Sequence, residues 1–145
     1  AAVSFARNVC NYSDANSTEI EEKTSNPIID LLPEQDDVTD MGGSLRLGAN
    51  EINVKPNTLA NKIYGQERIS KRHRHRYEFN TKYLDEFAEN GMIFSGESDN
   101  GRRMEILEIP SHKFFVGVQF HPEFNSRPGY PEQVFKAFTT AANQN

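Results

Sequence analysis

Apolar side chains recur at three- and four-residue intervals in four short stretches, which is the spacing of one face of a helix. These stretches are residues 1–9, 58–64, 82–89 and 131–142. Gly65 closes the second stretch and Gly91 lies just past the third, as glycine often does at a helix end. The first stretch begins with no capping residue, so we interpret it as the end of a helix that starts outside this sequence. In the last stretch Pro131 suits the first turn, and the positions with core spacing are Val134, Phe135, Phe138 and Ala142.

Shorter apolar runs, several of them alternating with polar residues, predict strands. We expect extended structure at 28–32, in two pieces within 41–54, and at 69–79, 92–95, 104–109 and 114–120. Asn100-Gly101 is a strong turn signal between two of these runs. Residues 11–40 are otherwise polar, with Pro27 and Pro33 as breakers, and predict a long loop. The whole pattern predicts a mixed α/β fold without internal repeats, in which a strand hairpin precedes the last strand and helix.

The composition fits at most one globular domain and narrows the classes of function. The chain has 145 residues, of which 36% are hydrophobic and 26% charged, and its net charge is -5. This acidic balance argues against a general nucleic-acid binder, and no apolar run approaches the roughly 20 residues that span a bilayer. The N-terminal segment is not a convincing signal peptide, one Cys forms no internal disulfide, and no Cys or His cluster has zinc spacing. We therefore expect a cytoplasmic protein without a metal site in this chain.

The segment FFVGVQFHPEF, residues 114–124, carries the sharpest chemical signal. An apolar strand runs into His121, and Pro122 ends it because proline has no N–H to donate to the ladder. Catalytic groups of α/β folds commonly lie at such strand ends. Glu123 can reach back to one imidazole nitrogen, which leaves the other free to accept a proton. The segment therefore predicts the base and the orienting carboxylate of a nucleophilic triad; the alternative is a surface His beside a solvated Glu.

Several motifs together carry a family resemblance that covers essentially the whole chain. GVQFHPE resembles the His-Pro-Glu motif of class I, or triad, glutamine amidotransferases, which hydrolyse glutamine through a Cys thioester and release ammonia. The segments DANSTE, MGGSLRLG, RHRHRYEFN and HPEFNSRP resemble the CTP synthase family in order and spacing, and they lie at residues 14–19, 41–48, 72–80 and 121–128. Small departures are Ser44, Leu45 and Phe79, where Thr, Met and Val are common. The resemblance implies an α/β fold with a central, mostly parallel sheet flanked by helices, of which residues 1–145 form the C-terminal portion.

The basic run at residues 71–78 has two interpretations. By charge alone it could be a phosphate or nucleic-acid patch, but strand alternation separates its Arg side chains from its His side chains: Arg72, Arg74 and Arg76 on one face, His73 and His75 on the other. The resemblance implies that Arg76, with its neighbour Tyr77, binds the glutamine substrate through its α-carboxylate, which a planar guanidinium suits. For Arg72 and Arg74, ion pairs with acids such as Glu78 are the simpler interpretation.

Arg46 and Cys10 each have a functional and a purely structural interpretation. The resemblance links Arg46 to GTP, an effector that stimulates glutamine hydrolysis, whereas a plain surface Arg is the alternative. Cys10 is the only thiol, but it lies at the end of the first predicted helix and not in the tight strand-to-helix turn that carries a nucleophile. We therefore interpret Cys10 as a bystander and expect the nucleophile to lie outside this chain.

The resemblance implies the activity and partners of the complete protein. This chain would supply the His and Glu of a Cys-His-Glu triad, need no cofactor of its own and be inactive alone. The preceding Cys-bearing half would complete the glutaminase, and a synthetase domain using ATP and magnesium would aminate UTP with the ammonia. A homo-oligomer is expected, with no nucleic-acid or membrane partner. The alternatives are an amidotransferase serving another synthetase, such as one making GMP or carbamoyl phosphate, and a non-catalytic regulatory module that kept the fold.

Overall fold

A computed structural model describes residues 1–31 and 46–144. The helices are α1 (Ala2–Asn8), α2 (Leu59–Tyr64), α3 (Leu84–Glu89) and α4 (Gln133–Asn143), with one-turn 3-10 helices at η2 (Thr81–Tyr83), η3 (Asp99–Gly101) and η4 (Pro122–Asn125). The strands are β1 (Asn16–Ser17), β2 (Pro27–Asp30), β3 (Arg46–Val54), β4 (Arg68–His75), β5 (Glu78–Phe79), β6 (Ile93–Ser98), β7 (Arg103–Glu108) and β8 (Val116–Val118). Within these residues, no helix is long and apolar enough to cross a membrane.

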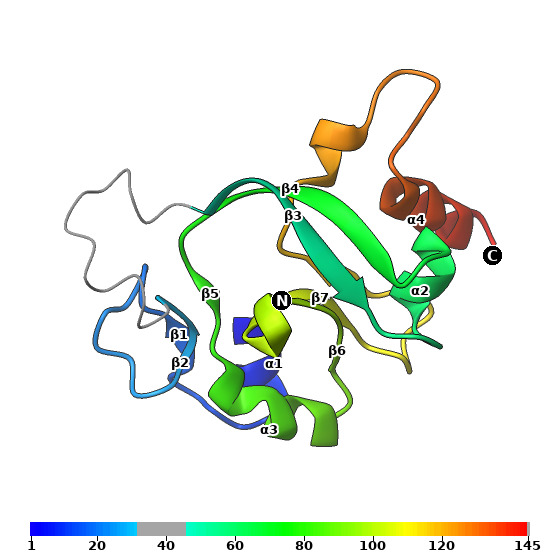
Figure 1. Ribbon diagram of the computed structural model, residues 1–145. Coiled ribbons are helices and arrows are strands. Elements are labelled where there is room, and N and C mark those ends of the chain that lie inside the picture. The colour runs from blue at the N-terminus through cyan, green and yellow to red at the C-terminus, as the bar shows by residue number, and fades with distance from the viewer. Residues whose placement is uncertain (32–45, 145) are drawn as a thin grey trace.

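The strands form two sheets (Figure 1). The larger has the order β4-β3-β6-β7-β8, and all of its described pairings are antiparallel. The smaller has the order β1-β2-β5, in which β1 and β2 are parallel and β2 and β5 antiparallel. The predicted mixed α/β class is confirmed. Parallel pairing, which we expected to predominate in the parent sheet, is seen within the described residues only between β1 and β2.

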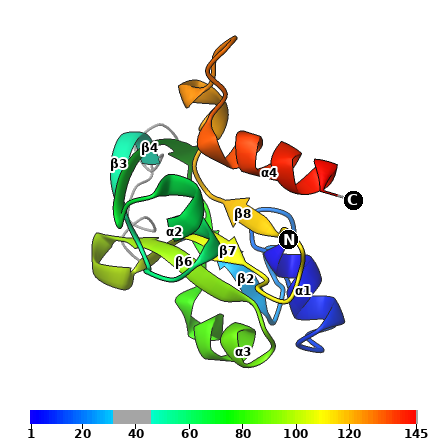
Figure 2. The ribbon, with the colours of Figure 1, turned by 90° about the vertical axis from the view of Figure 1, so that its right-hand side faces the viewer.

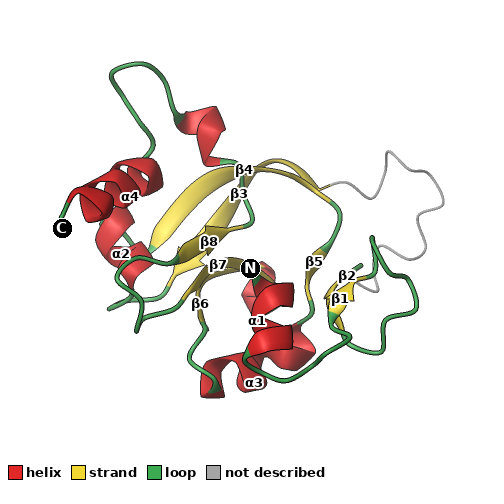
Figure 3. Cartoon of the chain, turned by 180° about the vertical axis from the view of Figure 1, so that it is seen from behind, coloured by secondary structure: helices red, strands yellow, loops and turns green. Residues whose placement is uncertain are grey.

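The helices cover the larger sheet at two ends. Figure 2 shows α3 at the bottom of the view and α4 above β8, and Figure 3 shows α2 beside α4. One core joins α1 and α3 to β5, β6 and β7 around Phe87, which is fully buried, and its ring centroid lies 5.0 Å from that of Phe79. The second core packs α2 against β3, β4 and Phe120. His121 therefore follows a residue that is anchored in the second core.

Local signals account for the ends of α2. The Thr58 side chain accepts a hydrogen bond from the Asn61 N–H at 3.1 Å, as a helix N-cap does. Gly65 stands at the C-terminal end with φ of 66°, a left-handed conformation that glycine adopts without steric cost. The predicted closure of this helix by Gly65 is confirmed.

The final helix differs from its prediction in start and orientation. It begins at Gln133, because the Glu132 side chain accepts from the Val134 N–H at 2.8 Å and caps it, so Pro131 precedes the helix. Val134 is buried as predicted, but Phe135 is 39% and Phe138 57% exposed. Val134 is the one buried residue of the described helix, so the period of its apolar positions was a poor guide to which side chains are buried.

One strand prediction also needed correction, and one loop prediction missed a short strand. The expected single extended run 69–79 divides into β4 and β5, which belong to different sheets. Residues 46–54 form one strand, β3, and residues 41–45 lie outside the described residues, so the expected division of 41–54 into two pieces stays a prediction. The strand expected at 28–32 is confirmed as β2, whereas β1 lies in the part of 11–40 that was expected to be loop. Pairing between distant segments, which local pattern does not encode, divided the run 69–79.

Candidate active site

His121 lies where the chain leaves the larger sheet. β8 ends at Val118, and Phe120 is then buried at 3% exposure. The His121 N–H donates to the Arg72 carbonyl of β4 at 2.9 Å. Pro122 begins η4, where a missing N–H is tolerated because the first turn needs no such donor. The backbone of His121 is thus held between β4 and η4.

Glu123 orients the His121 ring. Nδ1 of His121 lies 2.7 Å from Oε1 of Glu123, so the predicted hydrogen bond between them is confirmed. The bond from His121 lowers the pKa of Glu123 and favours its carboxylate form. A carboxylate at Nδ1 places the ring proton on that nitrogen, which leaves the lone pair of Nε2 to accept a proton. Nε2 has no hydrogen-bond partner among residues 1–31 and 46–144. The pair is accessible, since the side chains of His121 and Glu123 are 36% and 55% exposed.

Aromatic contacts restrict the ring further. The ring centroids of His121 and Phe124 lie 5.5 Å apart, and the Arg72 guanidinium lies 5.6 Å from the centroid of Phe124. Arg72 therefore touches this segment twice, with its backbone carbonyl at His121 and its side chain over Phe124. These contacts favour one orientation of the base, although Phe124 is itself 52% exposed.

Arg76 and Tyr77 form the link between β4 and β5. The predicted alternation holds along β4, where Arg72 and Arg74 are exposed and His73 is buried. Arg76 is half-buried, and its Nε is enclosed with no hydrogen-bond partner in the described part of the chain. A guanidinium without an internal partner is available to an external anion. Its predicted role as the substrate-carboxylate ligand stays a prediction, as does that of Tyr77.

Gln119 is a polar site residue that the sequence motifs did not single out. Its side-chain Nε2 lies 2.9 Å from the Tyr77 carbonyl and 3.0 Å from Nδ1 of His75. Its backbone N–H donates to the Glu105 carbonyl at 2.9 Å. The available signal was a single amide inside an apolar run, two positions before His121.

Arg46 enters a buried ion-pair network. Its Nη1 lies 2.5 Å from Oε1 of Glu105, and its Nη2 donates to the Ser98 hydroxyl at 3.0 Å. Only 10% of the Arg46 side chain is exposed. The alternative of a plain surface Arg is therefore wrong, while the effector role stays a prediction.

The surroundings of Cys10 differ from those of a catalytic nucleophile. It is 8% exposed in the core that α1 shares with α3. Burial, with the Glu86 charge second, raises the pKa of the Cys10 thiol and disfavours the reactive thiolate. This environment fits the interpretation of Cys10 as a bystander.

Comparison with known proteins decides the family. The profile described as glutamine amidotransferase class-I matches residues 1–141. The chain belongs to the class I glutamine amidotransferase family. It is 54% identical over 142 residues to the CTP synthase of Archaeoglobus fulgidus and 55% identical over 145 residues to that of Lactiplantibacillus plantarum. These alignments cover 98% and 99% of this chain but 27% of each relative, so the chain spans about a quarter of their length.

A solved structure agrees with this family assignment. The chain is similar to the Trypanosoma brucei CTPS glutaminase domain with bound acivicin, with a TM-score of 0.91 and 35% sequence identity. The match covers 99% of this chain and 56% of that one. The fold of this class I amidotransferase chain is therefore that of a glutaminase domain.

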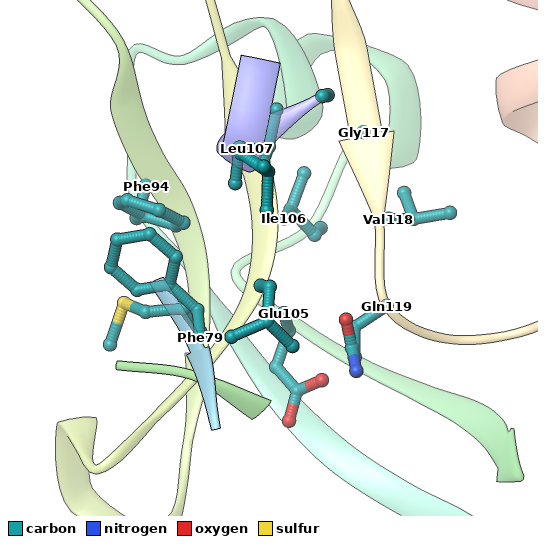
Figure 4. Close-up of a pocket in the computed structure, with 13 residues that line it drawn as sticks. Phe79, Phe94, Glu105, Ile106, Leu107, Gly117, Val118 and Gln119 are labelled. Carbon is teal, nitrogen blue, oxygen red and sulfur yellow. The ribbon is translucent and has the colours of Figure 1, made fainter. Parts of the chain in front are cut away.

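An apolar cavity of about 230 Å³ lies beside the site of this amidotransferase chain. Figure 4 shows Glu105 and Gln119 together at one end of it and Leu107 at the other. Ala1 and the first residues of α1, Ala2 and Val3, line it on one side. Gly117 and Val118 line it from β8, the edge strand among the described strands. In the described ranges no cluster of three or more His, Cys, Asp or Glu side chains is arranged to hold a metal.

Proposed function

We propose that this chain is the C-terminal portion of the glutaminase domain of a CTP synthase. The observation that carries the proposal is the His121–Glu123 pair at the end of β8, in a chain of the class I amidotransferase family. The relatives that are similar over nearly the whole chain are named CTP synthase. Here glutamine and water would give glutamate and ammonia, and the ammonia would aminate UTP.

The free Nε2 of His121 fits the role of general base. It would take the proton of a Cys thiol, and the thiolate would attack the amide carbon of glutamine. The imidazolium would then return that proton to the leaving nitrogen, so that ammonia departs and a thioester remains. Water, activated by the same nitrogen, would cleave the thioester to glutamate. Glu123 would hold the ring tautomer and stabilise the imidazolium throughout.

The thiol would come from a Cys-bearing segment outside residues 1–145. The one Cys of this chain is buried and has a raised pKa. Among the described strands β8 stands at the edge of the sheet, and an unpaired strand edge can accept an added strand. The apolar cavity between β8 and the start of α1 would be covered by the same segment. The segment would then arrive close to His121, where its thiol is needed.

Arg76 would bind the α-carboxylate of glutamine, with Tyr77 beside it. Its enclosed, unpartnered Nε supports this assignment, because a buried guanidinium donor without an acceptor is costly until an anion arrives. The link between β4 and β5 would thus bind the substrate, and the segment after β8 would supply the base.

The complete enzyme would add the remaining parts. A synthetase domain would use ATP and magnesium, GTP would act as effector, and the enzyme would be a cytoplasmic homo-oligomer. This chain itself would bind no cofactor and no nucleic acid or membrane. Arg46 would belong to the GTP response; since its guanidinium is engaged with Glu105 and Ser98, it would reach an effector only by exchanging those partners.

Replacement of Arg76 in the complete enzyme tests the proposed function. Arg76→Ala should raise KM for glutamine by about 10- to 100-fold, the effect of losing a charge-assisted hydrogen bond. Arg76→Lys should also weaken binding, because the planar fork is lost. CTP formation from supplied ammonia should be unchanged. Arg74→Ala is the matched control, since Arg74 is an exposed Arg of β4, two residues before Arg76. Equal loss of both activities would contradict a carboxylate role.

The two alternative functions predict different results in assays of the complete enzyme. An amidotransferase serving another synthetase would hydrolyse glutamine without aminating UTP. A non-catalytic module would do neither, and mass measurement of the complete polypeptide would show whether a Cys-bearing segment precedes Ala1. Glutamine-dependent CTP formation by the complete enzyme would exclude both alternatives.

A further inference from the structure

We propose that Gln119 is a positioning residue that sets the Arg76–Tyr77 segment in register with His121. This inference rests on the proposed function, in which that segment binds substrate and His121 is the base. Gln119 would touch neither glutamine nor the thiol; it would act through the residues it connects.

The side-chain amide of Gln119 meets two acceptors. The Tyr77 carbonyl oxygen, 2.9 Å from Nε2, can only accept a hydrogen bond. The Nδ1 atom of His75 lies 3.0 Å from the same Nε2. An amide nitrogen has two protons, so one group satisfies both neighbours, and this fixes which end of the amide faces them.

The state of His75 agrees with this pattern. Burial, followed by the charges of His73 and Arg46, lowers the pKa of His75 to about 4, whereas Glu105 opposes the shift. A neutral ring that carries its proton on Nε2 has a lone pair at Nδ1, which can accept a hydrogen bond from the Gln119 amide. Oε1 of Glu78 also lies near Nδ1, at 3.5 Å, farther away than the Gln119 amide. If the Gln119 amide were flipped, its oxygen and Oε1 of Glu78 would both face this lone pair and be repelled by it. The position beside Nδ1 therefore requires a hydrogen-bond donor.

Backbone hydrogen bonds on both sides of Gln119 hold residues 119–121 in place against the sheet. Its own N–H is bonded to Glu105 of β7, and the N–H of His121 is bonded to Arg72 of β4. The three-residue segment 119–121 therefore contacts β4 at Arg72 and again beyond the end of that strand, at Tyr77. Without the amide, the Arg76–Tyr77 segment would lose a hydrogen bond that relates it directly to the chain carrying the base.

Two substitutions in the complete enzyme separate this role from a general loss of folding. Gln119→Met keeps the approximate length and removes both donors; Gln119→Glu places an acceptor against the Tyr77 carbonyl. We expect Gln119→Met to lower glutamine-dependent kcat/KM by about 10-fold and Gln119→Glu by about 100-fold, in line with lost hydrogen bonds and misplacement of reacting groups. Both variants should raise KM for glutamine and lower kcat together, whereas activity with supplied ammonia should stay unchanged.

Hydrogen exchange gives a readout that does not depend on activity. Peptides that cover residues 76–80 should exchange faster in Gln119→Met than in the unsubstituted enzyme, while those of α4 should not. Gln133→Met, at an exposed position that starts α4, is the matched control and should change neither exchange at 76–80 nor kinetics.

The outcomes are separable. Unchanged exchange at residues 76–80, or unchanged kcat/KM for glutamine in both Gln119 variants, would overturn the positioning role. A joint fall of both activities and of the thermal midpoint would also overturn it, because Gln119 would then be a folding residue. An unsubstituted enzyme without glutaminase activity would instead refute the proposed function, and the exchange data would still decide whether Gln119 holds the segment.

Discussion

Two His–Glu pairs in the described part of the chain have hydrogen bonds of nearly the same length and very different surroundings. Nδ1 of His121 lies 2.7 Å from Glu123, and Nε2 of His73 lies 2.8 Å from Glu105. The first pair lies on a segment at the sheet end, with side chains 36% and 55% exposed, whereas both side chains of the second pair are fully buried between β4 and β7. A short bond from imidazole to carboxylate is therefore no mark of catalysis by itself.

The second imidazole nitrogen separates the two pairs. In His73, Nδ1 faces the Lys71 carbonyl at 3.0 Å, so both ring nitrogens face acceptors and none can take up a proton from a substrate. In His121, Nε2 has no partner in the described part of the chain. The buried pair is thus suited to hold β4 to β7, and the exposed pair is suited to move a proton.

The carboxylates differ in the same way. Burial alone would raise the pKa of Glu105, but hydrogen bonds from His73 and Ser98, together with the charge of Arg46, outweigh it and lower the pKa to about 2. The pKa of Glu123 is lowered mainly by its hydrogen bond with His121. Glu105 thus has several buried partners, whereas the main partner of Glu123 is one accessible side chain.

The sharpest test of the comparison is replacement of His121. His121→Asn in the complete enzyme should lower glutamine-dependent kcat by about 10⁴-fold, as loss of a triad base does. The thermal midpoint and ammonia-dependent CTP formation should stay unchanged, because His121 is exposed and contributes little to either core. Steady-state kinetics with glutamine and with ammonia are the measurements.

His112→Asn is the matched control for this prediction, since His112 is also exposed and bonds locally to Phe114. It should leave both activities intact. Residual glutaminase activity of His121→Asn near the unsubstituted level would remove the base from the proposed mechanism.

The buried pair should respond in stability instead. Glu105→Gln removes one partner of His73 and Arg46 and leaves buried charge uncompensated, which costs about 3 kcal/mol in the free energy of unfolding. Denaturant unfolding would measure it, with Glu51→Gln, at an exposed position of β3, as the control. We expect kcat per folded molecule to change little. An unchanged unfolding free energy would mean that the network does not stabilise the fold.

Lowering the pH should reveal how much the same network contributes to the free energy of unfolding. Because the folded-state pKa of Glu105 lies at about 2, below its ordinary value of 4.5, the stability it contributes is fully present above pH 4.5. That contribution is lost as the pH falls from 4.5 towards 2. The unfolding free energy of Glu105→Gln should therefore fall less steeply across this window than that of the unsubstituted protein.

The smallest of these effects should come from the exposed carboxylate. Glu123→Gln keeps an acceptor for Nδ1 but loses the charge that stabilises the imidazolium, so glutamine-dependent kcat should fall by about 10- to 100-fold. Thermal unfolding should be unchanged, in contrast to Glu105→Gln. The two Glu→Gln variants, assayed in parallel for activity and unfolding, would exchange their expected phenotypes if our assignment of the pairs were reversed.

The sequence alone determined the parts that depend on local chemistry. The apolar run into His121-Pro122 predicted a base at a strand end, and the two-residue spacing to Glu123 predicted the hydrogen bond that the structure contains. Thr58 and Gly65 delimited a helix because capping is a property of neighbouring residues. The family motifs extended this to the class I amidotransferases, which the profile match supports.

Tertiary structure decided what depends on distant partners. The run 69–79 became two strands in two sheets because its halves pair with β3 and β2, segments far away in the sequence. Arg46 is buried because Glu105 and Ser98, more than fifty residues later in the chain, meet it. Gln119 joins the site only through His75 and Tyr77. Periodicity reports which face of an element is apolar, but hydrogen bonds between segments distant in sequence exist only once the sheet has placed them together.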